Sequence, residues 1–213
     1  MPATRPPAAP LAGRYITLTP VGEADFAALF DAIGHPAVFA GGYGGGAAGL
    51  RAGRDDFAAW LRGYLPWSTG LSFAVRLRGG PHDGELVGTS SLADLDLANE
   101  GAHIGWTAYD PRVWGTAVNA EAKLLLLGLA FEHGFSRVKL QADAANSRSR
   151  AAIERLGAVP EGVLRHERRR ADGSWRDTAI YSILVEEWPT VRERLEGRLA
   201  QREGRPVLFR SAA

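Results

Sequence analysis

The sequence predicts a single α+β domain whose central sheet is mixed, mostly antiparallel and flanked by helices. Segments in which apolar and polar residues alternate indicate strands, and segments with apolar residues three or four positions apart indicate amphipathic helices. No long linker, internal repeat or block of like charge interrupts residues 11–200. We therefore expect both kinds of segment to share one hydrophobic core.

Charge and cysteine content narrow the function classes. The chain of 213 residues has 25 Lys and Arg against 24 Asp and Glu, which leaves a net charge of +1. A protein that coats DNA non-specifically carries a much larger positive charge, so direct nucleic-acid binding is not expected. The chain has no Cys, which excludes disulfides, thiolate metal sites and a cysteine nucleophile and is typical of a reducing compartment.

Membrane insertion and secretion are also not expected. The longest apolar run, Leu124–Phe131, is about half of the roughly 17 to 25 residues that a membrane-spanning helix needs. Residues 1–10 include one Arg and four Pro but no apolar segment of the kind found in signal peptides. We expect a flexible N-terminal tail there, and a cytoplasmic protein.

The first part of the chain predicts one strand and two helices. Residues 13–19 alternate in the manner of a half-buried strand, and residues 26–33 and 54–65 carry apolar side chains at helical spacing. Gly34-His35-Pro36 is expected to end the first helix. Residues 41–49, between the two helices, are rich in glycine and are predicted to form a loop.

The middle of the chain predicts a hairpin, a strand and a long helix. Residues 73–77 and 85–92 alternate on either side of the turn Gly79–Gly84, which indicates a β-hairpin. A further strand over 103–109 ends at Asp110-Pro111, and a helix is expected over 116–133.

The last part predicts a crossover unit, a second hairpin and a closing helix. A strand over 137–144 and a helix over 147–156 continue the order strand, helix, strand, helix that starts at residue 103. Two strands flank Asp172-Gly173, and residues 186–201 have the apolar stripe of an amphipathic helix.

Three short motifs are weak evidence for a binding site. Gly44–Gly49 matches G-x-G-x-x-G, but a dinucleotide site needs a strand leading into the motif, and here a helix-like segment precedes it. His166-Glu167 is followed by arginines and not by a second His four residues on, so no metal site is predicted. The basic run Arg165–Arg170 has the charge to touch phosphate, although charges along a strand more often form a solvated face.

The segment from His103 to Phe131 indicates a phosphate site. It combines a strand, the turn sequence R-x-x-G-x-A over Arg112–Ala117 and the start of a helix. Amides at a helix start lack partners within the helix, and the helix dipole adds partial positive charge there. Gly115 and Ala117 have little side-chain bulk, so a pyrophosphate can approach these amides closely.

A second motif, Asn146-Ser147-Arg148-Ser149, begins 29 residues after Ala117, between the next strand and helix. The ordered combination of strand, R-x-x-G-x-A, helix, strand, N-x-x-S and helix resembles the GNAT superfamily of acetyl-CoA-dependent N-acetyltransferases, and within it the RimJ/RimL-like branch. Further matches over residues 11–190 include Ala152–Ala158 and Glu161–Arg165.

The resemblance implies a GNAT acetyltransferase domain over residues 11–188. A flexible tail over 1–10 would precede it, and a C-terminal amphipathic helix and tail over 189–213 would follow. A fold of this kind implies acetyl-CoA as cosubstrate and no metal.

The resemblance also implies a role for each matched position. The loop would bind the pyrophosphate mainly through main-chain amides, and the strand from Trp106 would diverge from its neighbour and pair with the pantetheine arm. Asn146 would contact the pantetheine, and it is also suited to cap the following helix. Ser149 would lie near the sulfur as an acid for the departing thiolate. The implied cofactor-binding residues are Thr107, Ala108, Tyr109, Arg112, Val113, Trp114, Gly115, Thr116, Ala117 and Asn146.

Several groups remain open as the general base. RimJ/RimL-like sequences often carry Glu where this chain has His103, and histidine titrates near neutrality. Glu100, Asp94, Asp96 and water are the alternatives. Deprotonating an α-amine of pKa near 8 at pH 7 costs only about 1.4 kcal/mol, against about 4.6 kcal/mol for a lysine, so a weak base suffices for a protein N-terminus.

The implied activity is direct transfer of acetyl from the thioester to a primary amine, with the N-terminal α-amine of a ribosomal or other protein as the expected acceptor. A small-molecule amine, an antibiotic or a lysine is an alternative acceptor. A catalytically silent acetyl-CoA-binding module and an RNA- or ribosome-associated protein that uses Arg165–Arg170 are alternatives of other classes. An exposed strand or the helix over 186–201 leaves homodimer formation open.

Overall fold

Eight strands pair into one sheet in the computed structural model, which describes residues 2–211. The spatial order is β1-β2-β3-β4-β5-β6-β8-β7. Neighbouring strands are antiparallel except β5 and β6, which are parallel. The predicted fold class, a mixed and mostly antiparallel sheet flanked by helices, is confirmed. The strands are β1 Leu11–Ala12, β2 Ile16–Pro20, β3 Leu71–Leu77, β4 Leu86–Asp96, β5 Gly101–Tyr109, β6 Arg137–Asp143, β7 Val159–Arg169 and β8 Trp175–Leu184.

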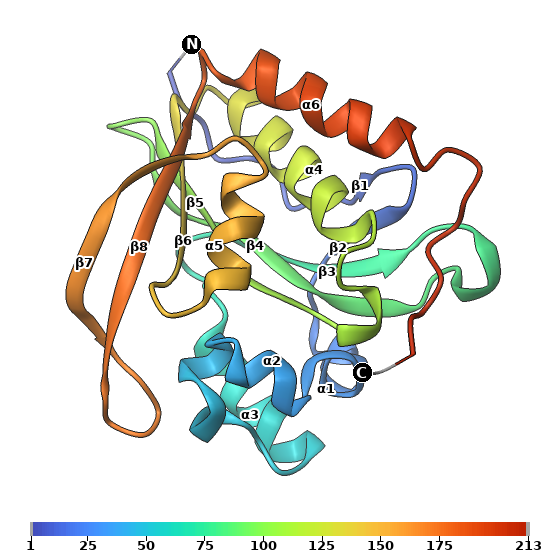
Figure 1. Cartoon of the computed structure of the whole chain (residues 1–213), viewed down its shortest axis with the longest axis vertical. Coiled ribbons are helices and arrows are strands. Elements are labelled where there is room, and N and C mark those ends of the chain that lie inside the picture. Colours follow the sequence, from blue (N-terminus) through green and yellow to red (C-terminus); the bar gives the residue numbers. More distant parts are fainter. Residues whose placement is uncertain (1, 212–213) are drawn as a thin grey trace.

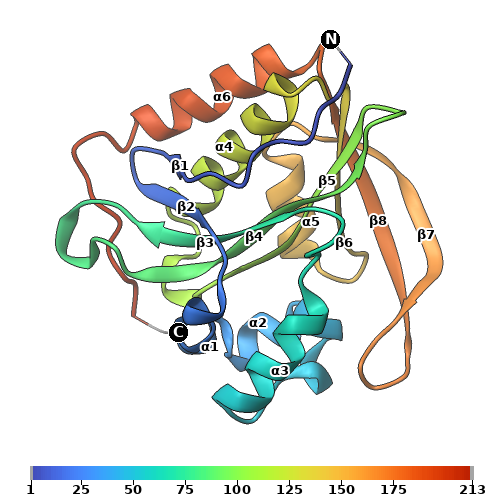
Figure 2. The ribbon, with the colours of Figure 1, turned by 180° about the vertical axis from the view of Figure 1, so that it is seen from behind.

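Helices cover both faces of the sheet (Figure 1). Helices α4 and α6 lie side by side, and α1, α2 and α3 gather at the opposite side of the molecule, as the view from behind also shows (Figure 2). Helix α5 follows β6 and packs against it. The helices are α1 Phe26–Ile33, α2 Pro36–Ala40, α3 Arg54–Tyr64, α4 Val118–Glu132, α5 Ser147–Glu154 and α6 Trp188–Ala200.

Strand periodicity divides the core into two clusters. In β3, Phe73 and Val75 belong to the cluster that includes α4 and α6, while Ala74 between them belongs to the cluster of α1, α2 and α3. Successive side chains of a strand point to opposite faces of the sheet, so β3 supplies both clusters. The alternation that predicts this strand therefore also assigns its two faces.

Only the second part of the predicted strand over 13–19 is a strand, since β2 begins at Ile16; the short β1, Leu11–Ala12, lies before the predicted range. The chain turns between β1 and β2, and the amides of Arg14, Tyr15 and Ile16 donate to the buried Glu121 carboxylate of α4 at 2.7, 2.7 and 2.8 Å. These donors serve α4 rather than a neighbouring strand, which interrupts the sheet pairing. The partner is more than 100 residues away, so local periodicity carries no sign of it.

Helix α2 was not expected from the sequence. The His35-Pro36 step ends α1 as predicted, but it also begins a new helix. Proline is favourable at the first position of a helix, and His35 Nδ1 accepts a hydrogen bond from the amide of Ala37 at 3.1 Å as the cap. The glycine-rich segment that follows, predicted as a loop, forms only short turns over Tyr43–Gly45 and Ala47–Gly49.

The C-terminal helix is amphipathic, as predicted. Val191, Leu195 and Leu199 of α6 are buried in the cluster that includes α4. At the other terminus, residues 2–10 form no regular secondary structure, although the Thr4 amide donates to the His133 carbonyl at 2.9 Å. The flexibility of residues 1–10 stays a prediction. No helix between residues 2 and 211 is long and apolar enough to cross a membrane.

Candidate active site

The strands β5 and β6 diverge at the centre of the sheet. They pair in parallel at Gly101–Arg137, Ala102–Val138 and His103–Lys139, and the pairing ends there although β5 continues to Tyr109 and β6 to Asp143. Main-chain donors and acceptors on this edge of β5 are therefore left for another partner.

A bulge bends β5 just beyond the point of divergence. Against β4, Ser91 pairs with Gly105 but Thr89 pairs with Ala108, so β5 contains an extra residue between these pairs. Trp106 lies there with a φ of 48°. A bulge re-aims the side chains of the bent strand, and here it marks the segment whose main chain the resemblance assigns to the pantetheine arm.

A cavity of about 510 Å³ occupies the space that the divergence opens. Strands β5 and β6, the turn after β5 and the first turns of α4 and α5 form much of its wall. Ten of the twelve predicted site residues line it, and Arg112 and Ala117 do not. The ten are His103, Thr107, Ala108, Tyr109, Val113, Trp114, Gly115, Thr116, Asn146 and Ser149.

The turn before α4 presents free main-chain donors. Within residues 2–211, the amides of Gly115, Ala117 and Asn119 have no hydrogen-bond acceptor. Gly115 has a φ of +72°, in the left-handed region that favours glycine. Free amides at the start of a 15-residue helix suit an anion such as pyrophosphate, so this turn can hold the phosphate end of the cosubstrate.

Arg112 faces away from this cavity. Its amide donates to Asp110 Oδ1 at 2.8 Å, and its Nη2 donates to Asp110 Oδ2 at 2.6 Å. The hydrogen bonds to Asp110 raise the pKa of the guanidinium. Arg112 also lies over the Phe209 ring, with 3.8 Å between the guanidinium carbon and the ring centroid. These contacts make Arg112 part of the scaffold of the turn.

The chain beyond α6 returns to the same turn. The Arg202 guanidinium donates to the Gly115 carbonyl at 3.1 Å, and the Arg210 amide donates to the Arg112 carbonyl at 3.0 Å. A Cβ added at Gly115 would lie 3.2 Å from the Arg210 guanidinium. The C-terminal segment thus holds the turn from outside and brings two cations close to it.

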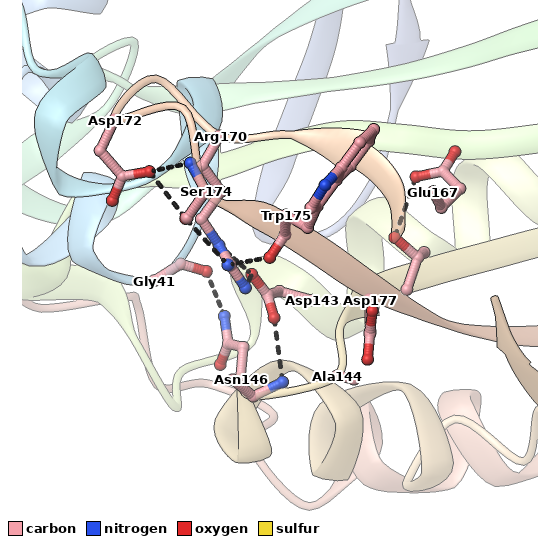
Figure 3. A network of polar contacts seen from close by, with 12 residues as sticks. Gly41, Asp143, Ala144, Asn146, Glu167, Arg170, Asp172, Ser174, Trp175 and Asp177 are labelled. Atoms are coloured by element: carbon pink, nitrogen blue, oxygen red, sulfur yellow. Dashed lines mark hydrogen bonds and ion pairs between the residues drawn. The ribbon is translucent and has the colours of Figure 1, made fainter. Parts of the chain in front are cut away.

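Asn146 caps helix α5, as predicted. Its Oδ1 accepts from the Ser149 amide at 3.0 Å, and its Nδ2 donates to the Gly41 carbonyl (Figure 3). The side chain therefore ties the start of α5 to the end of α2. Ser149 lines the cavity, and its hydroxyl has no hydrogen-bond partner in the part of the chain that the structure describes.

His103 combines burial with an unused nitrogen. Its Nδ1 lies 3.0 Å from Asp94 Oδ2, while its Nε2 is buried in the cavity wall and has no partner among the described residues. Burial lowers the pKa of His103, and the hydrogen bond from His103 lowers the pKa of Asp94. An ionised carboxylate only accepts hydrogen bonds, so Nδ1 carries the proton and Nε2 is free to accept one.

Lys123 is a cavity residue that sequence reasoning missed. It is buried in α4, and its ammonium donates to Thr107 Oγ1 at 2.8 Å and to Ser90 Oγ at 3.2 Å. Burial lowers the pKa of Lys123 to about 7. The signal available in the sequence was a lysine inside an apolar helical segment, one turn after Asn119 on the same helix face.

The opposite end of the cavity is lined by arginine and tyrosine side chains that the sequence did not single out as a group. Arg168 and Arg176 come from the β7–β8 hairpin, and Tyr43 and Tyr64 from the glycine-rich loop and α3. The two tyrosine rings pack edge to face, with 5.2 Å between their centroids. These residues are far apart in the sequence, so only the fold brings them together.

Known proteins resemble this chain in sequence and in fold. A model of the acetyltransferase (GNAT) domain family matches residues 16–159, more than half of the 213 residues. The Bacillus subtilis protein named "Putative ribosomal N-acetyltransferase YdaF" is 38% identical over 109 residues, which are 50% of this chain and 58% of that protein. The match thus spans little more than half the length of that relative.

Solved structures agree over most of the chain. A GCN5-related N-acetyltransferase from Brucella melitensis has a TM-score of 0.82 and 27% identity, with coverage of 92% of this chain and 87% of that one. Mycobacterium smegmatis RimJ in complex with CoA-disulfide, at 23% identity, has the same fold, with a TM-score of 0.70 over 89% of this chain and 92% of that one. With the family match, these likenesses confirm the resemblance inferred from the motifs, and the chain belongs to the GNAT acetyltransferase family.

Proposed function

We propose that this protein transfers acetyl from acetyl-CoA to the N-terminal α-amine of a protein. One observation carries the proposal: a single cavity is lined by Gly115 and Asn119, whose amides are free, and by His103, whose Nε2 has no partner within residues 2–211. An acyl donor held by its phosphates at one end would thus have its thioester within a site that also contains a proton acceptor.

Main-chain groups would carry most of the donor binding. The amides of Gly115, Ala117 and Asn119 would bind the pyrophosphate, and the unpaired edge of β5 beyond His103 would pair with the amide groups of the pantetheine arm. A β5 amide beside the bulge would polarise the thioester carbonyl and stabilise the negative charge that develops on its oxygen.

His103 would act as the general base. The acceptor amine attacks the thioester carbon, a C–N bond forms and the C–S bond breaks. The proton lost by the amine passes to His103 Nε2 directly or through one water, and the departing thiolate takes a proton from solvent or from Ser149. Asp94 would hold the imidazole in the tautomer that accepts at Nε2, because it accepts the Nδ1 proton at 3.0 Å.

The choice of an α-amine rests on acidity and on the similarity to a protein named as a ribosomal N-acetyltransferase. Neutralising an α-amine at pH 7 costs about 1.4 kcal/mol, which is about 3 kcal/mol less than for a lysine. A histidine of lowered pKa is a weak base, so it suits the acceptor that is easier to deprotonate.

The test is acetylation of peptides by the purified protein. Three sets of acceptors are incubated with acetyl-CoA: peptides with a free N-terminus, peptides with a blocked N-terminus and one internal lysine, and small amines. The products are identified by mass spectrometry. We expect acetylation at the free α-amine. Acetylation of small amines alone would replace the acceptor class. Thermal stabilisation by acetyl-CoA with no acetylated product would reduce the protein to a binding module.

A further inference from the structure

A second cavity lies beside the proposed transfer site. It has a volume of about 260 Å³ and lies between the glycine-rich loop and the tip of the β7–β8 hairpin. Five residues line both cavities, so the two adjoin along this shared wall; they are Gly42, Tyr64, Asp143, Arg168 and Arg176. No residue of the 111–117 turn lines the second cavity, which leaves it on the acceptor side.

Arginines supply most of the charge around this cavity. Arg168, Arg169, Arg170 and Arg176 line it, against one carboxylate, that of Asp143. Asp143 is already paired, because its Oδ2 accepts from Arg170 Nε at 3.0 Å and from Arg170 Nη2 at 2.7 Å (Figure 3). Arg168 pairs with Glu167 at 3.5 Å, so the guanidinium groups of Arg169 and Arg176 leave an excess of positive charge at the cavity.

Arg176 has an unsatisfied guanidinium nitrogen at this cavity. Its Nε is buried without a hydrogen-bond acceptor, and within residues 2–211 it forms no ion pair. Burial lowers the pKa of its guanidinium, which reflects the cost of removing the charge from water. The guanidinium is partly buried and lacks an acceptor at Nε, and a carboxylate at this place would accept charge-assisted hydrogen bonds from it.

The walls of the cavity are tied together by hydrogen bonds. The Ala171 amide at the hairpin tip donates to the Gly45 carbonyl at 2.9 Å, Arg170 ties the tip to the end of β6, and Asn146 ties α5 to Gly41 (Figure 3). Glycines in the facing loop carry no side chain into the space. A cradle that exists before binding loses little conformational freedom when a ligand enters.

We propose that the acceptor is an acidic peptide N-terminus, with Asp or Glu at its second or third residue, whose carboxylates bind in this arginine-lined cavity while the α-amine reaches His103. The inference rests on the proposed function and names its substrate class. Positive charge beside the amine also favours the neutral, nucleophilic form of that amine, because a like charge nearby disfavours the ammonium.

A short acidic peptide fits these observations better than RNA does. The arginines line a concave space of about 260 Å³ that adjoins the transfer site, whereas a nucleic-acid surface needs cations spread along several phosphates. RNA binding through the same arginines remains a separate outcome of the test.

The test compares matched peptides and matched variants. Two peptides are used that differ only at the second and third residues, Ala-Glu-Glu and Ala-Gln-Gln followed by the same sequence. Their kcat/KM is measured with the wild-type protein, with Arg176→Gln and Arg168→Gln, and with Arg192→Gln as control. Arg192 lies on the exposed face of α6 and pairs with Glu196 there. Thermal stabilisation by acetyl-CoA checks that each variant is folded.

We expect the wild-type protein and Arg192→Gln to prefer the acidic peptide by about tenfold or more, mainly in KM, with a preference that weakens as salt is added. Arg176→Gln should lose most of this preference. If the wild-type protein had the same kcat/KM for the acidic peptide as for the neutral peptide, the inference would be wrong, while N-terminal acetylation would stand.

Peptide binding to the acetyl-CoA-loaded protein, followed by fluorescence anisotropy, separates the inference from the proposed function. Binding that prefers the acidic peptide and depends on Arg176, without any acetylation, would overturn the proposed function alone. If a single-stranded RNA oligonucleotide displaces the peptide and its own binding falls in Arg176→Gln, the arginines serve RNA and the inference is wrong.

Discussion

The two ends of the cavity present different kinds of binding groups. The donor end, around residues 111–120, offers main-chain amides on a turn made of neighbouring residues. The acceptor end offers side chains from three distant segments, the glycine-rich loop, α3 and the β7–β8 hairpin. A binding site made of main chain needs only small residues at close spacing, whereas a site made of side chains needs the whole fold.

This difference explains why the donor end is readable in the sequence and the acceptor end is not. It also has consequences for substitution. Changes of backbone geometry should be most damaging at the donor end, while changes of single side chains should be most damaging at His103 and at the acceptor end.

The largest effect is expected at the proposed base. His103→Gln removes the proton acceptor, so kcat/KM should fall by about 100-fold or more. In the wild-type protein, activity should decline as pH falls through the pKa of His103, which burial holds below its ordinary value; protonation then occupies Nε2. This acidic limb should be absent from the residual activity of His103→Gln.

His133→Gln, at the end of α4 and outside the cavity, is the matched control for this pH profile. If the acidic limb is unchanged in His103→Gln, another group is the general base, and the catalytic side chain lies elsewhere than at His103.

A large effect is also expected at the donor turn. Gly115→Val forces a β-branched residue to a φ of +72° and places its Cβ 3.2 Å from the Arg210 guanidinium. The strained turn would relax to another geometry in the free protein, and restoring the binding geometry would cost about 1 to 3 kcal/mol, so the affinity for acetyl-CoA should fall by about 10- to 100-fold. Calorimetric titration measures it. Gly84→Val creates similar strain, at a φ of +77° and with open space around it, and should leave the affinity unchanged.

Protonation of Lys123, a buried side chain of the cavity, should affect the stability of the protein. The folded-state pKa of about 7 lies below the value of about 10.4 for a lysine in an unfolded chain. Between these values the unfolded chain binds the extra proton, so the free energy of unfolding should rise with pH, by at most about 1.4 kcal/mol per unit.

Lys123→Met should remove this rise between pH 7 and 10, and denaturant unfolding at several pH values measures it. Lys139→Met, at a partly exposed lysine of β6, is the control. Parallel stability curves for Lys123→Met and the wild-type protein would mean that Lys123 does not titrate in this range.

The smallest effect is expected for the proposed acid. A thiol of pKa about 8.5 leaves without much help, so Ser149→Ala should lower kcat by about threefold or less. Ser147→Ala, two residues earlier on the same helix, is the control. A loss comparable to that of His103→Gln would contradict the view that main-chain groups carry most of the work at the donor end.

The sequence by itself determined the order and type of nearly all elements. The alternation in β3 and β5 and the helical spacing in α4 and α6 reflect burial that repeats every two or every three to four residues, and such periods are visible in a window of a few positions. The donor turn was equally visible, because small residues and a helix start lie together within Arg112–Ala117.

Tertiary structure decided the features that depend on distant partners. The Glu121 carboxylate accepts hydrogen bonds from amides of residues 14–16 and so interrupts strand pairing at the start of the sheet. The Lys123 ammonium donates to two hydroxyl groups, on β4 and β5. Arg176 meets the glycine-rich loop only because the β7–β8 hairpin is tied to it. Local periodicity records which face of an element is buried, but the partner of a buried charge is set by packing between elements, and that is decided only when the chain has folded.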